Sequence, residues 1–291
     1  MRTDGPVVIA LDGRAPSAST LAWGIAEAVR RRAAVVLTQV VASPWTSTFW
    51  GTYPVIDAVD AEVEAKESLT RLEHREAARH PMLDISIDVR RGSVVPELRE
   101  LSTAAQLVVV GAGGPSVRGR TGVLGAQLAA HAHCPVAVVR HDPDGPMPPE
   151  APIVVGVDGS PASLEAARVA AREAWMRGRA LIVAHARPTL ADPYGEGSLR
   201  PGVTQDVDDR THQAARRVQS SLAGENPGLD VRLELLDDNP AAALVRLGRR
   251  SALLVVGTRG LGSFRGMLLG SVSTEVIRSA SCPVLVVHDN G

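Results

Sequence analysis

PVVIALDG, Pro6 to Gly13, returns later in the chain as PIVVGVDG, Pro152 to Gly159, and this repeat decides the fold. Each copy is an apolar run that ends in Asp-Gly, and 146 residues separate Asp12 from Asp158. A short apolar run that stops at turn residues is typical of a buried strand. A duplication at a fixed offset predicts two copies of one domain, and 291 residues suffice for both.

Two more pairs of segments support the duplication. LVVVGAGG returns as LLVVGTRG and HCPVAVV returns as SCPVLVV, at Leu107–Gly114, Leu253–Gly260, His133–Val139 and Ser281–Val287. Between the copies lies HDPDGPMPPEAP, whose prolines are typical of a stiff linker. We therefore expect one domain over residues 1–141, a linker over 142–151 and a second domain over 152–291.

Short apolar runs alternate with helical patterns inside each copy. In the second copy the expected strands are 153–157, 180–186, 231–236, 253–256 and 283–287. Helical spacing fills the intervals: Ser160-Pro161 predicts a capped helix start, Gly178 a helix end, and a further helix is expected over about 207–222. This alternation predicts an α/β fold: two flavodoxin- or Rossmann-like domains, each with a five-stranded parallel sheet and helices on both faces.

Composition narrows the classes of partner. The net charge is −1 with acids and bases interspersed, which disfavours nucleic acid as a partner. No apolar run approaches the roughly 20 residues that cross a bilayer, and the amino terminus lacks the layout of a signal peptide. We expect a cytoplasmic protein without a membrane partner. Its two cysteines do not form a disulfide framework.

The segment GTRGLGSFRGMLLGSVS, Gly257 to Ser273, directly follows the predicted strand LLVV and leads into a helix. A glycine-rich turn before a helix start exposes backbone N–H groups that suit phosphate oxygens. Ser271 and Ser273 add hydroxyl donors. The segment is not a P-loop, because Lys66 is the only lysine of the chain. It is not the dinucleotide fingerprint either, because that motif follows the first strand.

The spacing of this segment is G-x-x-G, nine residues, then G-S, with an aspartate ending the first strand. In this arrangement the chain resembles the ATP-binding members of the universal stress protein family, in tandem form and with the adenine nucleotide alpha hydrolase-like fold. The matching positions are Gly257, Gly260, Gly270 and Ser271 in the loop and Asp158 after the first strand. The repeat extends the resemblance over nearly the whole chain.

The resemblance implies a role for each matching position. Gly156, Val157 and Asp158 would flank the adenosine, and the backbone of Ala186 would contact the adenine. Val256, Gly257 and Gly260 would line the ribose and the first phosphates. Gly270, Ser271, Val272 and Ser273 would hold the β and γ phosphates. ATP with Mg²⁺ is the implied cofactor, and the last strands of the two copies would pair as an internal pseudo-dimer. A homodimer of the tandem chain is also implied.

The first copy departs from the motif. The corresponding residues are Asp12, Val40, Gly111, Gly114 and Gly122. Alignment on Gly122 leaves seven loop residues and puts Val123 and Gly125 in place of the two serines, whereas alignment on Gly125 leaves ten and puts Ala126 after it. Either alignment loses the hydroxyl that follows the glycine, so we expect this first site to be empty or to bind weakly.

Other interpretations of these residues are less specific. The loop glycines and Asp158 could serve only in turns, and Ser160 is better explained as a helix cap than as a nucleophile. His131, His133 and Cys134 do not share a helix face, so we expect no metal site. Fast phosphoryl transfer needs a cationic clamp and a base that are not evident. We expect a nucleotide-responsive stress protein; a slow ATPase or a nucleotide-free interaction module are the alternatives.

Overall fold

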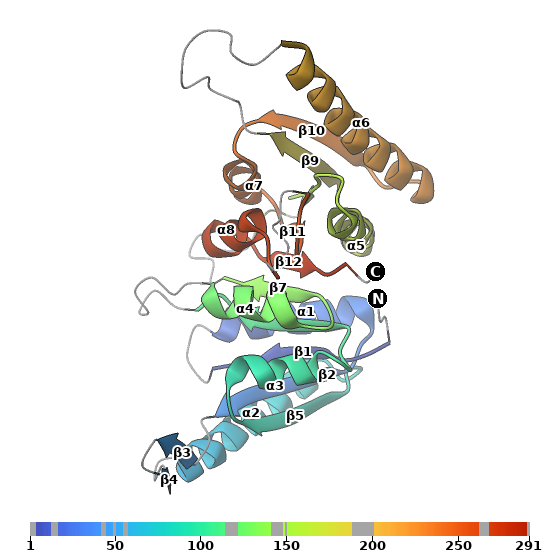
Figure 1. The fold of residues 1–291 in the computed structure, drawn as a ribbon. Helices are drawn as coiled ribbons and strands as arrows, with labels where there is room; N and C mark the ends of the chain where they lie inside the picture. Colours follow the sequence, from blue (N-terminus) through green and yellow to red (C-terminus); the bar gives the residue numbers. More distant parts are fainter. Residues whose placement is uncertain are drawn as a thin grey trace. The chain divides into compact units, whose positions relative to one another are not determined.

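The computed structural model describes residues 4–12, 17–41, 45–48, 51–54, 58–113, 122–140, 148, 150–187, 201–261 and 268–289. The chain divides into two compact units, residues 1–141 and 142–291. Figure 1 shows the strands and helices of each. In the described part of the chain, no helix has the length and apolar character needed to cross a bilayer.

The first unit holds a parallel sheet in the order β7-β6-β1-β2-β5. Its strands are β1 (Val7–Ala10), β2 (Val35–Val41), β5 (Ile85–Arg91), β6 (Leu107–Gly111) and β7 (Val136–Val139). Its helices are α1 (Ser17–Arg31), α2 (Ala58–Arg79), α3 (Val94–Leu101) and α4 (Val123–His131). A hairpin of β3 (Trp45–Thr48) and β4 (Gly51–Pro54) follows β2 in the chain. Aromatic and threonine residues, which favour strands, fill both of its arms.

The second unit repeats this order as β10-β9-β8-β11-β12. Its strands are β8 (Ile153–Gly156), β9 (Leu181–Arg187), β10 (Val231–Asp237), β11 (Leu253–Gly257) and β12 (Val284–Val287). Its helices are α5 (Pro161–Arg177), α6 (Pro201–Glu225), α7 (Pro240–Gly248) and α8 (Ser271–Ser279). Helix α5 packs on β8 and β11, α6 on β9 and β10, and α7 with α8 on the opposite face (Figure 1). The predicted fold, with a parallel sheet covered on both faces, is confirmed.

Counted along each unit, the strands lie in the order 3-2-1-4-5. This is the Rossmann order, whereas the flavodoxin order is 2-1-3-4-5. The central strands β8 and β11 are buried on both faces, as near-continuous apolar runs require. The order reverses between β8 and β11, so their carboxyl ends form the switch point at which ligands bind in such sheets.

The ends of two helices test the sequence patterns. Ser160 caps α5 by accepting from the Ser163 N–H, and Gly178 ends it in the left-handed conformation at φ 60°, so both predictions are confirmed. Helix α6 covers Pro201–Glu225, more than the predicted 207–222. Its first turns are largely polar and carry no apolar periodicity, and proline suits a first helical position.

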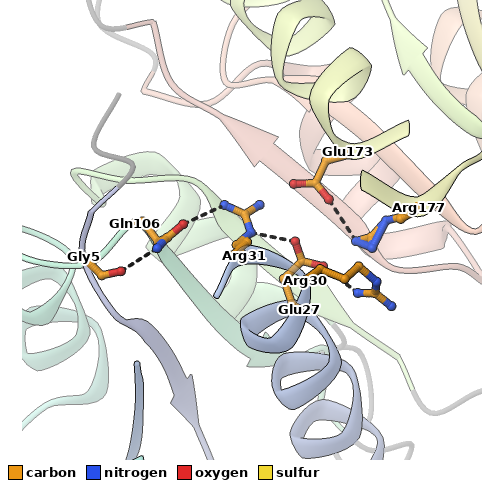
Figure 2. A network of polar contacts seen from close by, with 7 residues as sticks. All are labelled: Gly5, Glu27, Arg30, Arg31, Gln106, Glu173 and Arg177. Carbon is orange, nitrogen blue, oxygen red and sulfur yellow. Dashed lines mark hydrogen bonds and ion pairs between the residues drawn. The ribbon is translucent and has the colours of Figure 1, made fainter. Parts of the chain in front are cut away.

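The duplication extends to a buried ion pair. Glu27 Oε1 accepts from Arg31 Nε at 2.6 Å in α1, and Glu173 pairs with Arg177 at 3.0 Å in α5, again with 146 residues between equivalent positions (Figure 2). Both glutamates are fully buried. In the first unit, Arg31 also donates to Gln106 Oε1, whose amide donates to the Gly5 carbonyl (Figure 2). The pair therefore links α1 to the segments that lead into β1 and β6.

Candidate functional site

A cavity of about 310 Å³ lies at the switch point between β8 and β11. Every residue that the sequence predicts for the second-copy site lines it: Gly156, Val157, Asp158, Ala186, Val256, Gly257, Gly260, Gly270, Ser271, Val272 and Ser273. Ser163, Ala184, Pro240, Leu244 and Arg259 complete the lining. The structure therefore brings together, in one cavity, residues from five separate segments of the second unit.

The start of helix α8 forms the polar end of the cavity. Gly270 is its N-cap and supplies no side-chain cap, and its carbonyl accepts from the Thr274 N–H at 3.0 Å. The N–H groups of Ser271, Val272 and Ser273 come before the first intrahelical bond, so the helix offers them no acceptor. Together with the positive end of the helix dipole, they favour an anion at this place.

The two serines of this helix differ in what their hydroxyls do. Ser271 is exposed at the cavity. Ser273 is buried and its Oγ donates to the Gly257 carbonyl at 2.7 Å. That both hydroxyls serve as phosphate donors stays a prediction. In the structure the Ser273 hydroxyl joins α8 to the end of β11, whereas the Ser271 residue is exposed at the cavity.

Close contacts explain two of the three loop glycines, Gly257 and Gly260, but not Gly270. A Cβ at Gly257 would lie 2.8 Å from the backbone of Ala162, so glycine allows α5 to approach β11. A Cβ at Gly260 would overlap Asp158 Oδ2. Gly270 differs, because its φ of −72° suits any residue and its Cβ would meet nothing closer than 3.5 Å. The fold does not require glycine at position 270, whereas close approach of a ligand would.

Asp158 fastens the glycine-rich loop to the turn after β8. Its Oδ1 accepts from the N–H and hydroxyl of Ser160, at 3.0 and 2.6 Å, and its Oδ2 accepts from the Leu261 N–H at 2.7 Å. The Ser160 hydroxyl also lies 3.1 Å from the Arg259 carbonyl. Burial by itself raises the pKa of the Asp158 carboxyl, but the hydrogen bonds from Ser160, Leu261 and Ser163 outweigh it and hold that pKa below its ordinary value.

This lowered pKa predicts an acid-sensitive contribution to stability. Because the folded pKa lies below the unfolded value of about 3.9, ionised Asp158 stabilises the second unit above about pH 4. That contribution is lost as the pH falls through the folded pKa. Asp158→Asn should therefore flatten the fall in the free energy of unfolding between about pH 5 and pH 2, measured by urea denaturation. An acid limb as steep as that of the wild type would contradict this assignment.

The other end of the cavity is apolar and built from small side chains. Ala184 and Ala186 share one face of β9 and lie with Pro240 and Leu244 of α7. The Ala184 carbonyl accepts from the Val157 N–H at 2.9 Å, so Ala186, two residues on, directs its backbone groups to the same side. Strand β8 ends at Gly156, opposite Ala184. Ala186 therefore has a strand partner in β10 but none in β8.

His185 supports this end from the other face of the sheet. Its Nδ1 lies 2.8 Å from the Val157 carbonyl, which can only accept, so Nδ1 carries the proton. The ring is buried and meets His212 of α6 edge to face, with centroids 5.8 Å apart. Val157 is thus held by Ala184 through its N–H and by His185 through its carbonyl.

Sequence comparison assigns this architecture to a family. Residues 5–140 and 151–288 each match the model of the Universal stress protein family. The chain belongs to that family. A universal stress protein of Mycobacterium tuberculosis H37Rv is 32% identical over 294 residues, spanning 98% of this chain and 97% of the relative. Another, from Mycolicibacterium smegmatis, is 31% identical over 295 residues and spans 98% of each.

A solved structure of similar length has the same fold. A universal stress protein from Archaeoglobus fulgidus superimposes with a TM-score of 0.69 over 98% of this chain and 97% of its own, at 18% identity, which shows the shared fold. A universal stress protein solved in complex with cAMP is 30% identical to 49% of this chain and has a TM-score of 0.39. The tandem universal stress protein predicted from the sequence is therefore confirmed at the level of family and fold.

The first universal stress protein domain has the same backbone hydrogen bond before its last helix as the second domain. The Gly122 N–H donates to the Ala112 carbonyl at 2.7 Å, as Gly270 does to Thr258 in the second domain. This equivalence selects the alignment on Gly122. Gly125 instead lies inside α4, where a Cβ would be 2.7 Å from Val138 Cγ2. Gly122 has φ 79°, so here the backbone itself requires glycine.

Larger residues stand in the first domain at the apolar end of the site. Ala10, Thr38 and Val40 take the places of Gly156, Ala184 and Ala186. Thr38 is fully buried, as is Leu98, the equivalent of Leu244. Of the other predicted residues, Asp12 is exposed, Gly111 ends β6, and Gly114 lies outside the described residues. Three positions that are small in the second domain therefore carry larger side chains in the first.

His131, His133 and Cys134 lie at and after the end of α4. Among the described residues, no three histidine, cysteine or acidic side chains come together as metal ligands. His131 Nδ1 lies 2.8 Å from the Gln127 carbonyl of its own helix. Burial raises the pKa of the Cys134 thiol to about 12, against weaker opposing effects of a Val108 backbone hydrogen bond and Arg31.

Proposed function

We propose that the second domain binds ATP and that the protein is a cytoplasmic, nucleotide-responsive regulator. The observation that carries this proposal is Gly270. The fold leaves room for a side chain at this position, which is the N-cap position of α8, supplies no side-chain cap and borders the cavity. Glycine there is explained by an anion that approaches the first N–H groups of the helix.

The cavity suits the two ends of an adenine nucleotide. The small residues Ala184 and Ala186 leave an apolar space, and the backbone of Ala186 extends past the end of β8, where it can hydrogen-bond to a base. The start of α8 and the Ser271 hydroxyl offer donors to phosphate oxygens. Val157 and Asp158, at the end of β8, lie between these ends and would contact the sugar.

The described lining does not build a protein cage for Mg²⁺. Asp158 is its only carboxylate, and both of its oxygens accept hydrogen bonds from Ser160 and Leu261. Mg²⁺ prefers several oxygen ligands and keeps part of its water shell. The cation would therefore be bound mainly by the phosphates and water, and any Mg²⁺ requirement of binding would come with the nucleotide.

Rapid hydrolysis does not fit the same lining. A fast phosphoryl transfer needs cationic groups around the phosphates and a residue that orients the attacking water. Among the described lining residues, Arg259 is the only cation, and the one carboxylate, Asp158, is already fully hydrogen-bonded. The proposed activity is therefore binding, with at most slow ATP hydrolysis.

The test is the amount of nucleotide that the protein carries and binds. Because Ala10, Thr38 and Val40 of the first domain replace smaller residues of the second, we expect one ATP per chain rather than two. Mass spectrometry of the denatured purified protein should detect an adenine nucleotide, and isothermal titration of the stripped protein should give a stoichiometry near one.

The outcomes separate the competing functions. If the protein carries no nucleotide and does not bind ATP, the proposal is refuted, and a nucleotide-free interaction module is the function that is left. Rapid multiple turnover, lost when the site is blocked, would instead identify an enzyme. A stoichiometry of two would contradict the expectation of one ATP per chain. Dimerisation of the tandem chain stays a prediction that sedimentation can check.

A further inference from the structure

Few charged side chains line the cavity, and they differ in the interactions that they make within the protein. Of the described lining residues, only Asp158 and Arg259 carry charge. Asp158 is tied to Ser160 and Leu261. Arg259 is exposed, and no ion pair joins it to any acidic residue in the part of the chain that the structure describes. Arg265, the other basic residue of the loop, lies outside the described residues.

The backbone holds Arg259 at the phosphate end of the cavity. The Arg259 carbonyl lies 3.1 Å from the Ser160 hydroxyl. Its neighbour Thr258 donates its N–H to Val287 of β12 at 2.9 Å and accepts from the Gly270 N–H at 2.7 Å. A Cβ at Gly270 would lie only 3.7 Å from the Arg259 Cα. Arg259 is therefore anchored beside the N-cap of α8.

From this arrangement we infer that Arg259 makes the site selective for the number of phosphates, favouring a nucleoside triphosphate over a monophosphate. The inference rests on the proposed function of the cavity. Backbone N–H groups and Ser271 are neutral donors, so Arg259 is the described residue that responds to added negative charge at the far end of the phosphate chain. The Arg259 guanidinium can interact with the added phosphate charge without first breaking an ion pair to a described acidic residue.

The first domain lacks this feature. Gly113 stands where Arg259 stands in the second domain, and its φ of 83° is one that glycine adopts readily. The two copies therefore differ in charge at the same loop position. At this loop position the second domain, which holds the cavity, has a cation, and the first domain has none.

The test compares AMP and ATP on the same variants. Titration calorimetry of Arg259→Gln in the full chain should show ATP binding weakened about fivefold and AMP binding changed less than twofold, since an exposed charge contributes modestly. Arg259→Lys should recover most of the ATP affinity. The difference between Arg259→Gln and wild type should shrink in about 0.5 M salt, because salt screens exposed charges.

Arg278→Gln is the matched control, since it removes one exposed cation from the last turn of α8, away from the cavity lining. It should leave the ratio of ATP to AMP affinity unchanged. If Arg259→Gln weakens both nucleotides equally, or if Arg278→Gln has the same effect, the inference is overturned while the proposed function stands. If the wild type binds neither nucleotide, the proposed function fails, and the inference fails with it.

Discussion

Gly270→Asp is expected to abolish ATP binding to the second domain, with a loss of at least about 100-fold in affinity. The new carboxylate would occupy the place where the first N–H groups of α8 meet the phosphates, and it would repel them. Folding should survive, because φ is −72° and the nearest atom to a Cβ is 3.5 Å away. Aspartate is also a preferred N-cap, so the melting temperature should not fall. Titration calorimetry and thermal melts measure the two effects separately.

The first domain supplies the matched control. Gly122→Asp places the same side chain at the equivalent helix start, but there φ is 79°. It should destabilise its own domain by about 1 kcal/mol, because the left-handed region disfavours a Cβ, and it should leave ATP affinity unchanged. Retention of ATP binding within tenfold by Gly270→Asp would mean that the start of α8 does not hold the phosphates.

Glu27→Ala is expected to lower the free energy of unfolding of the first domain by about 3 kcal/mol. Glu27 is fully buried and accepts from both Arg30 and Arg31, at 2.9 and 2.6 Å. Arg31 is itself 3% exposed, so removing the carboxylate leaves a guanidinium shielded from water beside Gln106. Urea denaturation followed by circular dichroism measures the loss.

An exposed pair on α2 calibrates this result. Glu67 and Arg71 have the same i,i+4 spacing, but they lie 3.8 Å apart with side chains 65% and 71% exposed. Glu67→Ala should change the free energy of unfolding by less than about 1 kcal/mol. Equal effects of Glu27→Ala and Glu67→Ala would show that burial of the Glu27 pair adds nothing to the stability of the domain.

Most of the fold could be predicted because it depends on patterns that the sequence repeats. The apolar runs of β8 and β11 and the Ser160 cap of α5 are local signals, and the duplication presents both apolar runs in a second context. The choice of the Rossmann strand order over the flavodoxin order could not be made in this way. Strand order depends on pairing between distant segments, and local periodicity carries no information about which strands are neighbours.

The candidate site was predictable where a motif specifies it and not where packing completes it. Gly257, Gly260 and Gly270 follow a fixed spacing. Pro240 and Leu244 of α7 belong to no motif, and only the crossover after β10 brings them over Ala184. The i,i+4 spacing of these two residues was the available signal, but it does not say which strand the helix covers. The hydrogen bond from the Ser273 hydroxyl to the Gly257 carbonyl likewise could not be predicted, because it depends on how α8 packs against the end of β11.

The Ser160 hydroxyl belongs to two structures at once, since it caps the first turn of α5 and approaches the carbonyl of Arg259 in the glycine-rich loop. A displacement of the loop at Arg259 would therefore stretch a contact with the start of α5. Trp175 is exposed near the other end of the same helix. Suppose that a partner binds α5 with different affinities in two states of the loop. By thermodynamic reciprocity, the partner would then change the affinity for nucleotide by the same factor by which the nucleotide changes the affinity for the partner.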